Sequence, residues 1–360
     1  MTLFCLTGCT TIKVPISPEP PSPPKPTSKL SFAYVENAGS NSISMFTVSS
    51  FGIWTPTAPA TIPVGFQPES LVVDPSGRFV YVPNARGNTI SMFTIDLANG
   101  LLVPMSPATV PTGAFPQSIA IDPRNRFVYT ANSNDNTISM FTIDDSTGML
   151  TPTSPATVPS GLDPVGVTVD PTGRFVYSNN AGTVSMYTIN QSSGVLTATS
   201  PATIIYSGGY ANSLTVDPNG RYAYLPDYGS GVWIFAIDQT TGFLNLASTP
   251  FVSIGGGVTL MAIDPTSSFA YVVNRLGNSI SQFNVNATDG SLSPMSTPVI
   301  TNTGEPWQIL VDPSGQLAYV SDEGTNAVTI YSIGTNGALT VYSSAPTGSA
   351  PGGMGIAVKP

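Results

Sequence analysis

One Asp-Pro step, repeated at an almost constant interval, limits what this 360-residue chain can fold into. The step occurs six times, and its aspartates follow one another at intervals of 48, 48, 47, 47 and 48 residues. A period of this size indicates one structural unit that buries its apolar faces only by stacking on copies of itself. The six steps are Asp74-Pro75, Asp122-Pro123, Asp170-Pro171, Asp217-Pro218, Asp264-Pro265 and Asp312-Pro313.

Each unit contains four short apolar runs separated by turn residues. In the copy from Ser118 to Thr157 the runs cover residues 118–121, 127–131, 137–143 and 149–157. Runs this short, rich in Val, Ile, Thr, Tyr and Phe, indicate β-strands. A helical 3.6-residue period is absent from the sequence, so no helix is expected. The third run is apolar on both faces, which is typical of a sheet covered on both sides.

The two ends of the chain together supply a seventh unit. The C-terminal stretch 355–360 matches a first run, and residues 30–37 match a second run. Four-stranded units arranged radially form a β-propeller. We therefore predict that residues 30–360 form an all-β, seven-bladed β-propeller of four-stranded antiparallel blades. The C-terminal strand would complete the N-terminal blade and leave no long edge strand, so a monomer is expected.

The first 29 residues lie outside this repeat. Leu6-Thr7-Gly8-Cys9 resembles a bacterial lipobox, so we interpret residues 1–9 as a truncated lipoprotein signal with Cys9 as the lipidated residue. The alternative is that Cys5 and Cys9 are incidental. Residues 10–29 form a proline-rich tether. These features predict a cell-envelope protein, lipid-anchored on the periplasmic or cell-surface side, or a secreted one.

Composition excludes several classes of function. Charged residues make up 9% of the chain and the net charge is −9, which argues against nucleic-acid binding. Apolar runs fall short of the roughly 18 residues of a spanning helix, so membrane contact is expected only through the lipid anchor. The chain has no histidine, which removes the Ser-His-Asp triad and imidazole-bound metals. We predict no metal and no cofactor.

Two segments carry a resemblance to a known family. The stretch 77–84, Gly-Arg-Phe-Val-Tyr-Val-Pro-Asn, and the stretch 88–93, Asn-Thr-Ile-Ser-Met-Phe, resemble the lactonase family of seven-bladed propellers. That family includes 6-phosphogluconolactonases and muconate cyclases. Tyr129-Thr130-Ala131-Asn132 is also similar to the Tyr-Val-Thr-Asn signature of surface propellers. Because strand and turn residues carry the resemblance, it implies the fold more strongly than an activity.

The mouth of the central channel is the expected ligand site, because variable loop residues converge there. Ligand-binding candidates come from two variable positions of the repeat, although each could equally be an ordinary exposed loop residue. The first variable position lies five residues before the repeated Asp of each unit, or before Lys359 in the seventh unit. The residues at this position are Glu69, Gln117, Val165, Asn212, Thr259, Trp307 and Met354. The loops between second and third strands add Arg86, Asp135, Asp227, Tyr228, Arg275 and Glu323.

Two functions remain open at this stage. The first is a binding module in the cell envelope whose mouth holds a protein or carbohydrate ligand, through Gln117, Asn212, Trp307, Tyr228 and Asp135. The missing histidine, the low charge and the near-identical blades favour it. The alternative is a 6-phosphogluconolactonase-like hydrolase, which needs a base to activate water and a cation for the oxyanion. Its candidate residues are Glu69, Glu323 and Asp227 as base, and Arg86 and Arg275 as cation.

Overall fold

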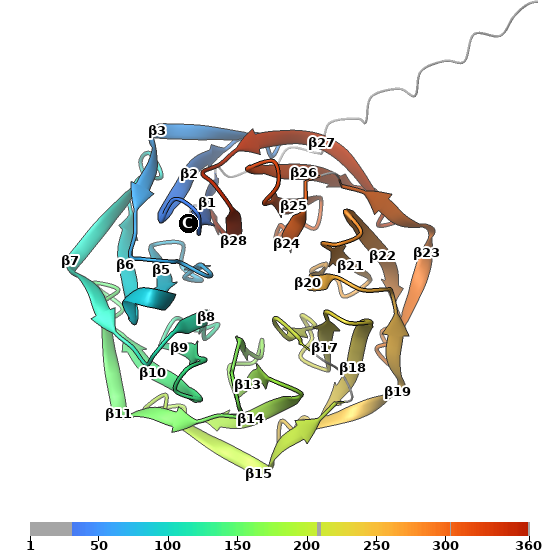
Figure 1. The fold of residues 1–360 in the computed structure, drawn as a ribbon, viewed down its shortest axis with the longest axis horizontal. Helices are drawn as coiled ribbons and strands as arrows, with labels where there is room; N and C mark the ends of the chain where they lie inside the picture. The colour runs from blue at the N-terminus through green and yellow to red at the C-terminus, as the bar shows by residue number, and fades with distance from the viewer. Residues whose placement is uncertain (1–30, 207–209, 303, 359–360) are drawn as a thin grey trace, which may run out of the picture.

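The computed structural model describes residues 31–206, 210–302 and 304–358. It consists of seven antiparallel sheets of four strands each, arranged as a ring around a central channel (Figure 1). The all-β, seven-bladed propeller predicted from the repeat is confirmed. The described residues contain one short 3-10 turn, η1 (Ala85–Gly87), and otherwise only strands and loops.

The blades are numbered I to VII in chain order. Blade I contains β28 (Pro351–Val358), β1 (Ser31–Asn37), β2 (Ser42–Val48) and β3 (Trp54–Pro63). Blade II contains β4 (Val72–Val73), β5 (Phe79–Asn84), β6 (Thr89–Ile95) and β7 (Leu102–Pro111). Blade III contains β8 (Pro116–Ile121), β9 (Phe127–Asn132), β10 (Thr137–Ile143) and β11 (Leu150–Pro159). Blade IV contains β12 (Gly166–Val169), β13 (Phe175–Asn180), β14 (Thr183–Ile189) and β15 (Leu196–Ile205).

The remaining three blades follow the same order from the channel outward. Blade V contains β16 (Thr215–Val216), β17 (Tyr222–Asp227), β18 (Gly231–Ile237) and β19 (Leu244–Ser253). Blade VI contains β20 (Val258–Ile263), β21 (Phe269–Asn274), β22 (Ser279–Val285) and β23 (Leu292–Thr301). Blade VII contains β24 (Pro306–Val311), β25 (Leu317–Asp322), β26 (Ala327–Ile333) and β27 (Leu339–Pro346).

The ring closes where the two ends of the chain pair. Strand β28 pairs with β1 in antiparallel register, with Phe32 opposite Ala357 and Tyr34 opposite Gly355. The C-terminal strand therefore completes the N-terminal blade, as the split seventh repeat predicts. This closure satisfies the backbone groups that would otherwise form an open edge.

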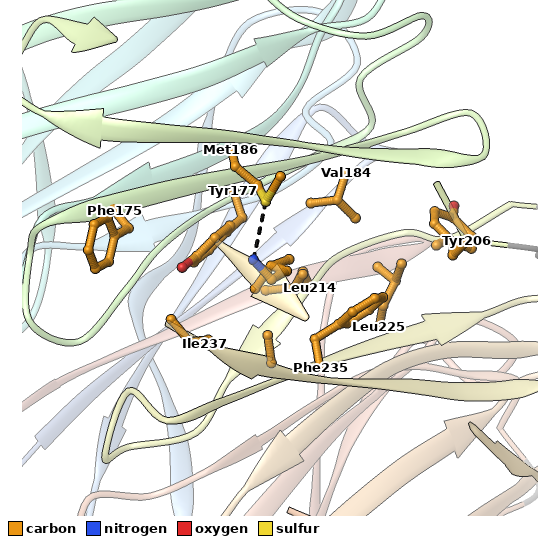
Figure 2. Close-up of a cluster of buried hydrophobic side chains, with 12 residues drawn as sticks. Phe175, Tyr177, Val184, Met186, Tyr206, Leu214, Leu225, Phe235 and Ile237 are labelled. Atoms are coloured by element: carbon orange, nitrogen blue, oxygen red, sulfur yellow. Dashed lines mark hydrogen bonds between the residues drawn. The ribbon is translucent and has the colours of Figure 1, made fainter. Parts of the chain in front are cut away.

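The hydrophobic core is divided into clusters between neighbouring blades. Ile138 and Met140 pack between blades III and IV, whereas Phe141 and Ile143 on the other face of β10 pack between blades II and III. Figure 2 shows the cluster between blades IV and V, where the backbone amide of Leu244 lies 3.4 Å from the sulfur of Met186. Each fully buried large apolar side chain contributes roughly 1.5–3 kcal/mol.

A tyrosine hydroxyl links almost every pair of neighbouring blades. Buried tyrosines of the second strands donate to a glycine carbonyl in the outer hairpin of the next blade, so their burial leaves no hydroxyl unpaired. The pairs are Tyr34–Gly100, Tyr81–Gly148, Tyr129–Gly194, Tyr177–Gly242, Tyr224–Gly290 and Tyr271–Gly337.

The Asp-Pro turns carry the hydrogen bonds that their sequence predicts. The carboxylate of Asp122 accepts the backbone amides of Arg126 at 2.5 Å and Phe127 at 3.0 Å. The Arg126 guanidinium pairs with the same carboxylate at 2.8 Å and lies 4.7 Å from the ring centroid of Phe127. Arginine stands four residues after the repeated aspartate in four copies, as Arg78, Arg126, Arg174 and Arg221, and the backbone amide of each donates to that aspartate.

Candidate active site at the channel mouth

The loops that enter the first strands bond to the loops between the second and third strands on one face of the ring. We call this face, around the channel opening, the mouth. One backbone hydrogen bond of this kind occurs in every blade: Ala38–Ala350, Ala85–Gln67, Ser133–Phe115, Ala181–Leu162, Tyr228–Tyr210, Arg275–Gly257 and Glu323–Glu305. The two variable sets of residues therefore lie on the same face.

An ion pair joins the mouth loops of blades VI and VII. Nη2 of Arg275, in the β21–β22 turn, donates to Oε2 of Glu323, in the β25–β26 turn. The guanidinium also lies 5.0 Å from the ring centroid of Trp307. Burial raises the pKa of Glu323, the charge of Arg275 opposes that rise, and Glu305 adds to it. Three of the predicted site residues are thus in contact.

Glu69 lies half-buried just before β4, on the blade II side of the mouth. Its Oε1 accepts a hydrogen bond from Nε2 of Gln67. Burial raises the pKa of Glu69, the bond from Gln67 lowers it, the charge of Glu323 raises it, and the charge of Arg86 lowers it. The side chain of Arg86 is exposed, with its guanidinium 5.6 Å from the ring centroid of Phe66. The carboxylates of blades II and VII are therefore electrostatically coupled at the mouth.

A third carboxyl group, Glu36, belongs to the same cluster and was not among the predicted residues. It sits near the end of β1, is 1% exposed, and accepts the backbone amide of Gly353 at 2.8 Å. Its Oε2 is buried without a hydrogen-bond partner. Burial raises the pKa of Glu36 well above its usual value, the Gly353 amide opposes this, and the charges of Glu69 and Glu323 add to it.

The sequence does contain a signal for Glu36. The repeat has Tyr-x-x-Asn/Asp in every second strand, and Glu36 is the third residue of its copy. The same slot in the other blades holds the uncharged residues Pro83, Ala131, Asn179, Pro226, Val273 and Ser321. A carboxyl group within an otherwise buried strand is costly unless it serves a purpose or finds partners.

Three carboxyl groups with raised pKa values and two arginines therefore share the mouth. Burial is the largest cause of each rise, and the charges of neighbouring carboxylates add to it. Such a site can take up and release protons, and it can stabilise a negative charge beside a guanidinium.

Comparison with known proteins places this architecture in a family. The profile described as "Lactonase, 7-bladed beta-propeller" matches residues 26–115, 103–209 and 208–357. The chain belongs to this lactonase family. No curated protein matches the chain.

Solved structures share the fold of this lactonase-family propeller at low identity. A candidate 6-phosphogluconolactonase from Bacteroides uniformis is 22% identical, with a TM-score of 0.77 over 92% of this chain and 100% of that one. One from Bacteroides fragilis is 21% identical, with a TM-score of 0.77 over 92% and 99%. The periplasmic gluconolactonase of Pseudomonas aeruginosa is 18% identical, with a TM-score of 0.74 over 92% and 100%. Identities this low show a common fold.

The ligand-binding residues predicted for this propeller are spread around the mouth. Nε2 of Gln117 donates to the Ser133 hydroxyl at 3.1 Å, and Asn212 donates to the Thr259 carbonyl at 3.4 Å. Tyr228 lines a cleft of about 400 Å³ with Arg275, Leu276, Asn278 and Glu305. This cleft places an aromatic residue beside the Arg275–Glu323 pair.

Two predicted carboxylates take part in loop structure. Oδ2 of Asp135 accepts the Ala114 amide at 2.6 Å. The buried Asp227 accepts the Gly229 amide at 3.2 Å and the Ser230 hydroxyl at 3.0 Å. Neither contributes to the pKa shifts of Glu36, Glu69 or Glu323. Cys9 and the tether lie outside the described residues.

Two further searches of the described residues gave no site. No group of three or more His, Cys, Asp or Glu side chains is placed to hold a metal ion within residues 31–206, 210–302 and 304–358. Within the same ranges, no helix has the length and apolar character needed to span a membrane.

Proposed function

We propose that this lactonase-family propeller hydrolyses a lactone at its mouth. The observation that carries the proposal is the Arg275–Glu323 ion pair at the mouth, with the half-buried carboxyl group of Glu69 on the same face. A base with a raised pKa and nearby guanidinium groups are what lactone opening requires. Two of the fold's neighbours are named as candidate 6-phosphogluconolactonases and one as a gluconolactonase, which supports this reaction class.

Glu69 is the best placed base. Its hydrogen-bond partner is the neutral amide of Gln67, whereas Glu323 is held by Arg275. Glu69 takes a proton from a water molecule, and the oxygen of that water forms a bond to the lactone carbonyl carbon. The arginines stabilise the oxyanion. The carbonyl re-forms as the ring C–O bond breaks, and Glu69 returns the proton to the leaving ring oxygen.

The charge of the site favours an uncharged sugar lactone over a phosphorylated one. Three carboxyl groups converge there, and one of the two arginines is already paired with Glu323. A phosphate group binds best where several cations or amide donors are free to meet it. We therefore infer an unphosphorylated aldonolactone as the substrate class.

A pH-stat assay of the full chain against sugar and aromatic lactones tests the proposal. Acid release should fall at least about 100-fold in Glu69→Gln, because a general base contributes 10²–10⁴-fold. Asp145→Asn removes a carboxylate that is 87% exposed and should leave the rate unchanged. A flat trace for the unmodified protein across the whole panel would exclude the hydrolase.

A second candidate function, recognition of a protein or carbohydrate, rests on apolar side chains of the mouth loops. Four of them are strongly exposed, and exposed apolar groups on one face favour binding of a partner. They are Phe66, Leu162, Tyr210 and Leu276. If the hydrolase assay is flat, glycan-array binding that is lost in Phe66→Ser would support this function.

The envelope location remains a proposal based on Leu6-Thr7-Gly8-Cys9 and the proline-rich residues 10–29. Mass spectrometry of the native protein should show a lipid-modified Cys9 as the first residue. An unmodified and uncleaved N-terminus would exclude the lipid anchor.

A further inference from the structure

A cavity of about 370 Å³ lies between blades VI and VII on the mouth side of the ring, where Gly304 and Thr325 of the mouth loops border it. Its walls come from the end of β23, from β25 and β26, and from β27. The residues that matter for its chemistry are Asn302, Asp322, Thr329, Tyr331 and Ser343.

Among the described residues that line the cavity, Asp322 alone is formally charged. It is 1% exposed. Its Oδ2 accepts a hydrogen bond from the Thr329 hydroxyl, while its Oδ1 is buried without a partner. The hydroxyl of Ser343, on another wall, is also buried and unpartnered. Two residues that line one cavity therefore each contain a buried polar atom without a partner, and each of these atoms would gain from a hydrogen bond.

The equivalent position carries asparagine in five of the other six blades. Asn274 is typical, because its amide donates to the hydroxyls of Ser279 at 3.1 Å and Ser281 at 2.9 Å. In blade VII the first of these hydroxyls is missing, since Ala327 replaces the serine. Three of the asparagines, Asn37, Asn84 and Asn274, also leave Oδ1 unpartnered. In these three asparagines the unpartnered atom is a neutral amide oxygen, whereas in Asp322 it is a carboxylate oxygen.

The outer strand of blade VII also differs from its copies. Strand β27 has eight residues, whereas β3, β7, β11, β15, β19 and β23 each have ten. The register shift between the third and fourth strands is accordingly smaller, from Ile330–Ser343 to Tyr331–Val341. Blade V also carries an aspartate at the position of Asp322, but Asp227 accepts the Gly229 amide and the Ser230 hydroxyl, whereas Oδ1 of Asp322 has no partner.

We propose that this cavity binds a small organic ammonium ion, with Asp322 as the counter-charge. A buried carboxylate without a cationic partner is unfavourable, and an ammonium group supplies both the charge and the missing donors. The hydroxyls of Ser343, Thr329 and Tyr331 can accept or share the remaining N–H bonds. A cavity of this volume is far larger than the roughly 30 Å³ of one water molecule, so it suits an organic cation rather than a bare metal ion.

The electrostatics of the cavity agree with a cationic guest. Burial raises the pKa of Asp322, and the hydrogen bond from Thr329 opposes this. None of the groups that act on its pKa is a cation. The chain as a whole carries a net charge of −9, which attracts small cations to its surface.

Ethanolammonium chloride is a suitable probe, with ethylene glycol as the neutral comparison and potassium chloride to match ionic strength. Thermal unfolding and titration calorimetry of the full chain measure binding, since a ligand of the native state raises Tm. The expected result is a rise in Tm with ethanolammonium and none with glycol. Asp322→Asn, which restores the residue found in five other blades, should abolish the rise. Asp145→Asn changes the charge equally at the surface and should retain it.

Three outcomes would overturn the proposal. One is an equal Tm rise in Asp322→Asn, which would place the cation elsewhere. Another is an equal response to ethylene glycol, which would indicate a hydroxyl ligand. The third is no heat and no Tm rise at 50-fold excess over a millimolar Kd, about 2.3 kcal/mol of stabilisation for a true site. Lactone hydrolysis at the mouth is independent of each of them.

Discussion

Arg275 donates to Glu323 across the boundary between blades VI and VII. Both residues directly follow the last residue of a second strand, so the pair links the same position of two neighbouring copies. The charge of Glu323 also acts beyond this ion pair, because it raises the pKa of Glu69 on the blade II side of the mouth. A substitution of Glu323 in blade VII should therefore change the pKa of Glu69, the proposed base in blade II.

Glu323→Gln should move the acid limb of the lactonase pH profile to lower pH. The variant removes the negative charge that raises the pKa of Glu69 and frees the positive charge of Arg275. Both changes favour ionised Glu69, so the base becomes active at lower pH. The dependence of kcat/KM on pH measures this directly, and carbon NMR of labelled glutamate reports it without turnover. A limb that stays in place or moves upward would contradict the coupling.

Glu36→Gln should stabilise the fold at neutral and alkaline pH. The pKa of Glu36 is raised in the folded protein, so its stability contribution is fully present below the unfolded pKa and is lost as pH rises through the folded pKa. Glutamine keeps the Oε1 that accepts the Gly353 amide but cannot ionise. Urea unfolding should show the variant more stable than the parent at pH 8, because ionisation of the buried Glu36 destabilises the folded parent and cannot occur in the variant.

The control for this prediction is the same comparison at pH 3, well below the usual glutamate pKa of about 4.3, where the parent Glu36 is largely protonated in both states. There the difference should shrink to the effect of the amide alone. A stability difference that is the same at both pH values would show that ionisation of Glu36 is not its cause.

The fold follows closely from the repeat because the same local chemistry recurs in each copy. The third strand of blade III was predicted at residues 137–143, and β10 has these bounds. The outer strand was predicted at 149–157 and runs from Leu150 to Pro159. Prolines are tolerated in this outer strand because it is the edge strand of its blade. The outward side of an edge strand needs no amide donors for pairing within the sheet.

The mouth was predictable in outline but not in its contacts. The two variable positions of the repeat bring Glu69, Arg275 and Glu323 to one face, as expected. The repeat pattern contains no information on the distances between side chains of different blades. The Arg275–Glu323 pair could therefore be identified only from the structure. Glu36 was not predicted as a site residue, because the repeat pattern assigns this position of the second strand to the hydrophobic core. Asp135 matches the chemistry in residue type, yet its carboxylate binds a backbone amide of its own blade.

Asp122→Ala should destabilise the ring by about 3 kcal/mol. The carboxylate is fully buried and accepts two backbone amides, and its loss leaves these donors and Arg126 without a partner. Urea unfolding measures the loss. Asp122→Asn retains one acceptor oxygen and should lose less. Asp145→Ala breaks an exposed ion pair with Arg78 and should change stability by under about 1 kcal/mol. Equal effects in the two alanine variants would contradict the role of the turn.

The blade VII–blade I interface offers a stabilising substitution. The residue two positions before the repeated tyrosine of the second strand is aromatic in six blades and packs beside a glycine of the next blade, as Phe32 does beside Gly100. In blade VII this residue is Leu317, beside Gly52, and it borders a cavity of about 230 Å³ on the face opposite the mouth.

Leu317→Phe should therefore raise the free energy of unfolding by about 1 kcal/mol, since filling a cavity commonly adds 0.5–2 kcal/mol. Leu317→Ala should lower it by about 2–5 kcal/mol, because it enlarges the cavity further. Thermal and urea unfolding of the two variants measure both signs. A phenylalanine variant less stable than the parent would mean that Trp54, which packs 4.9 Å from the Tyr319 ring centroid, already occupies the space of the missing ring.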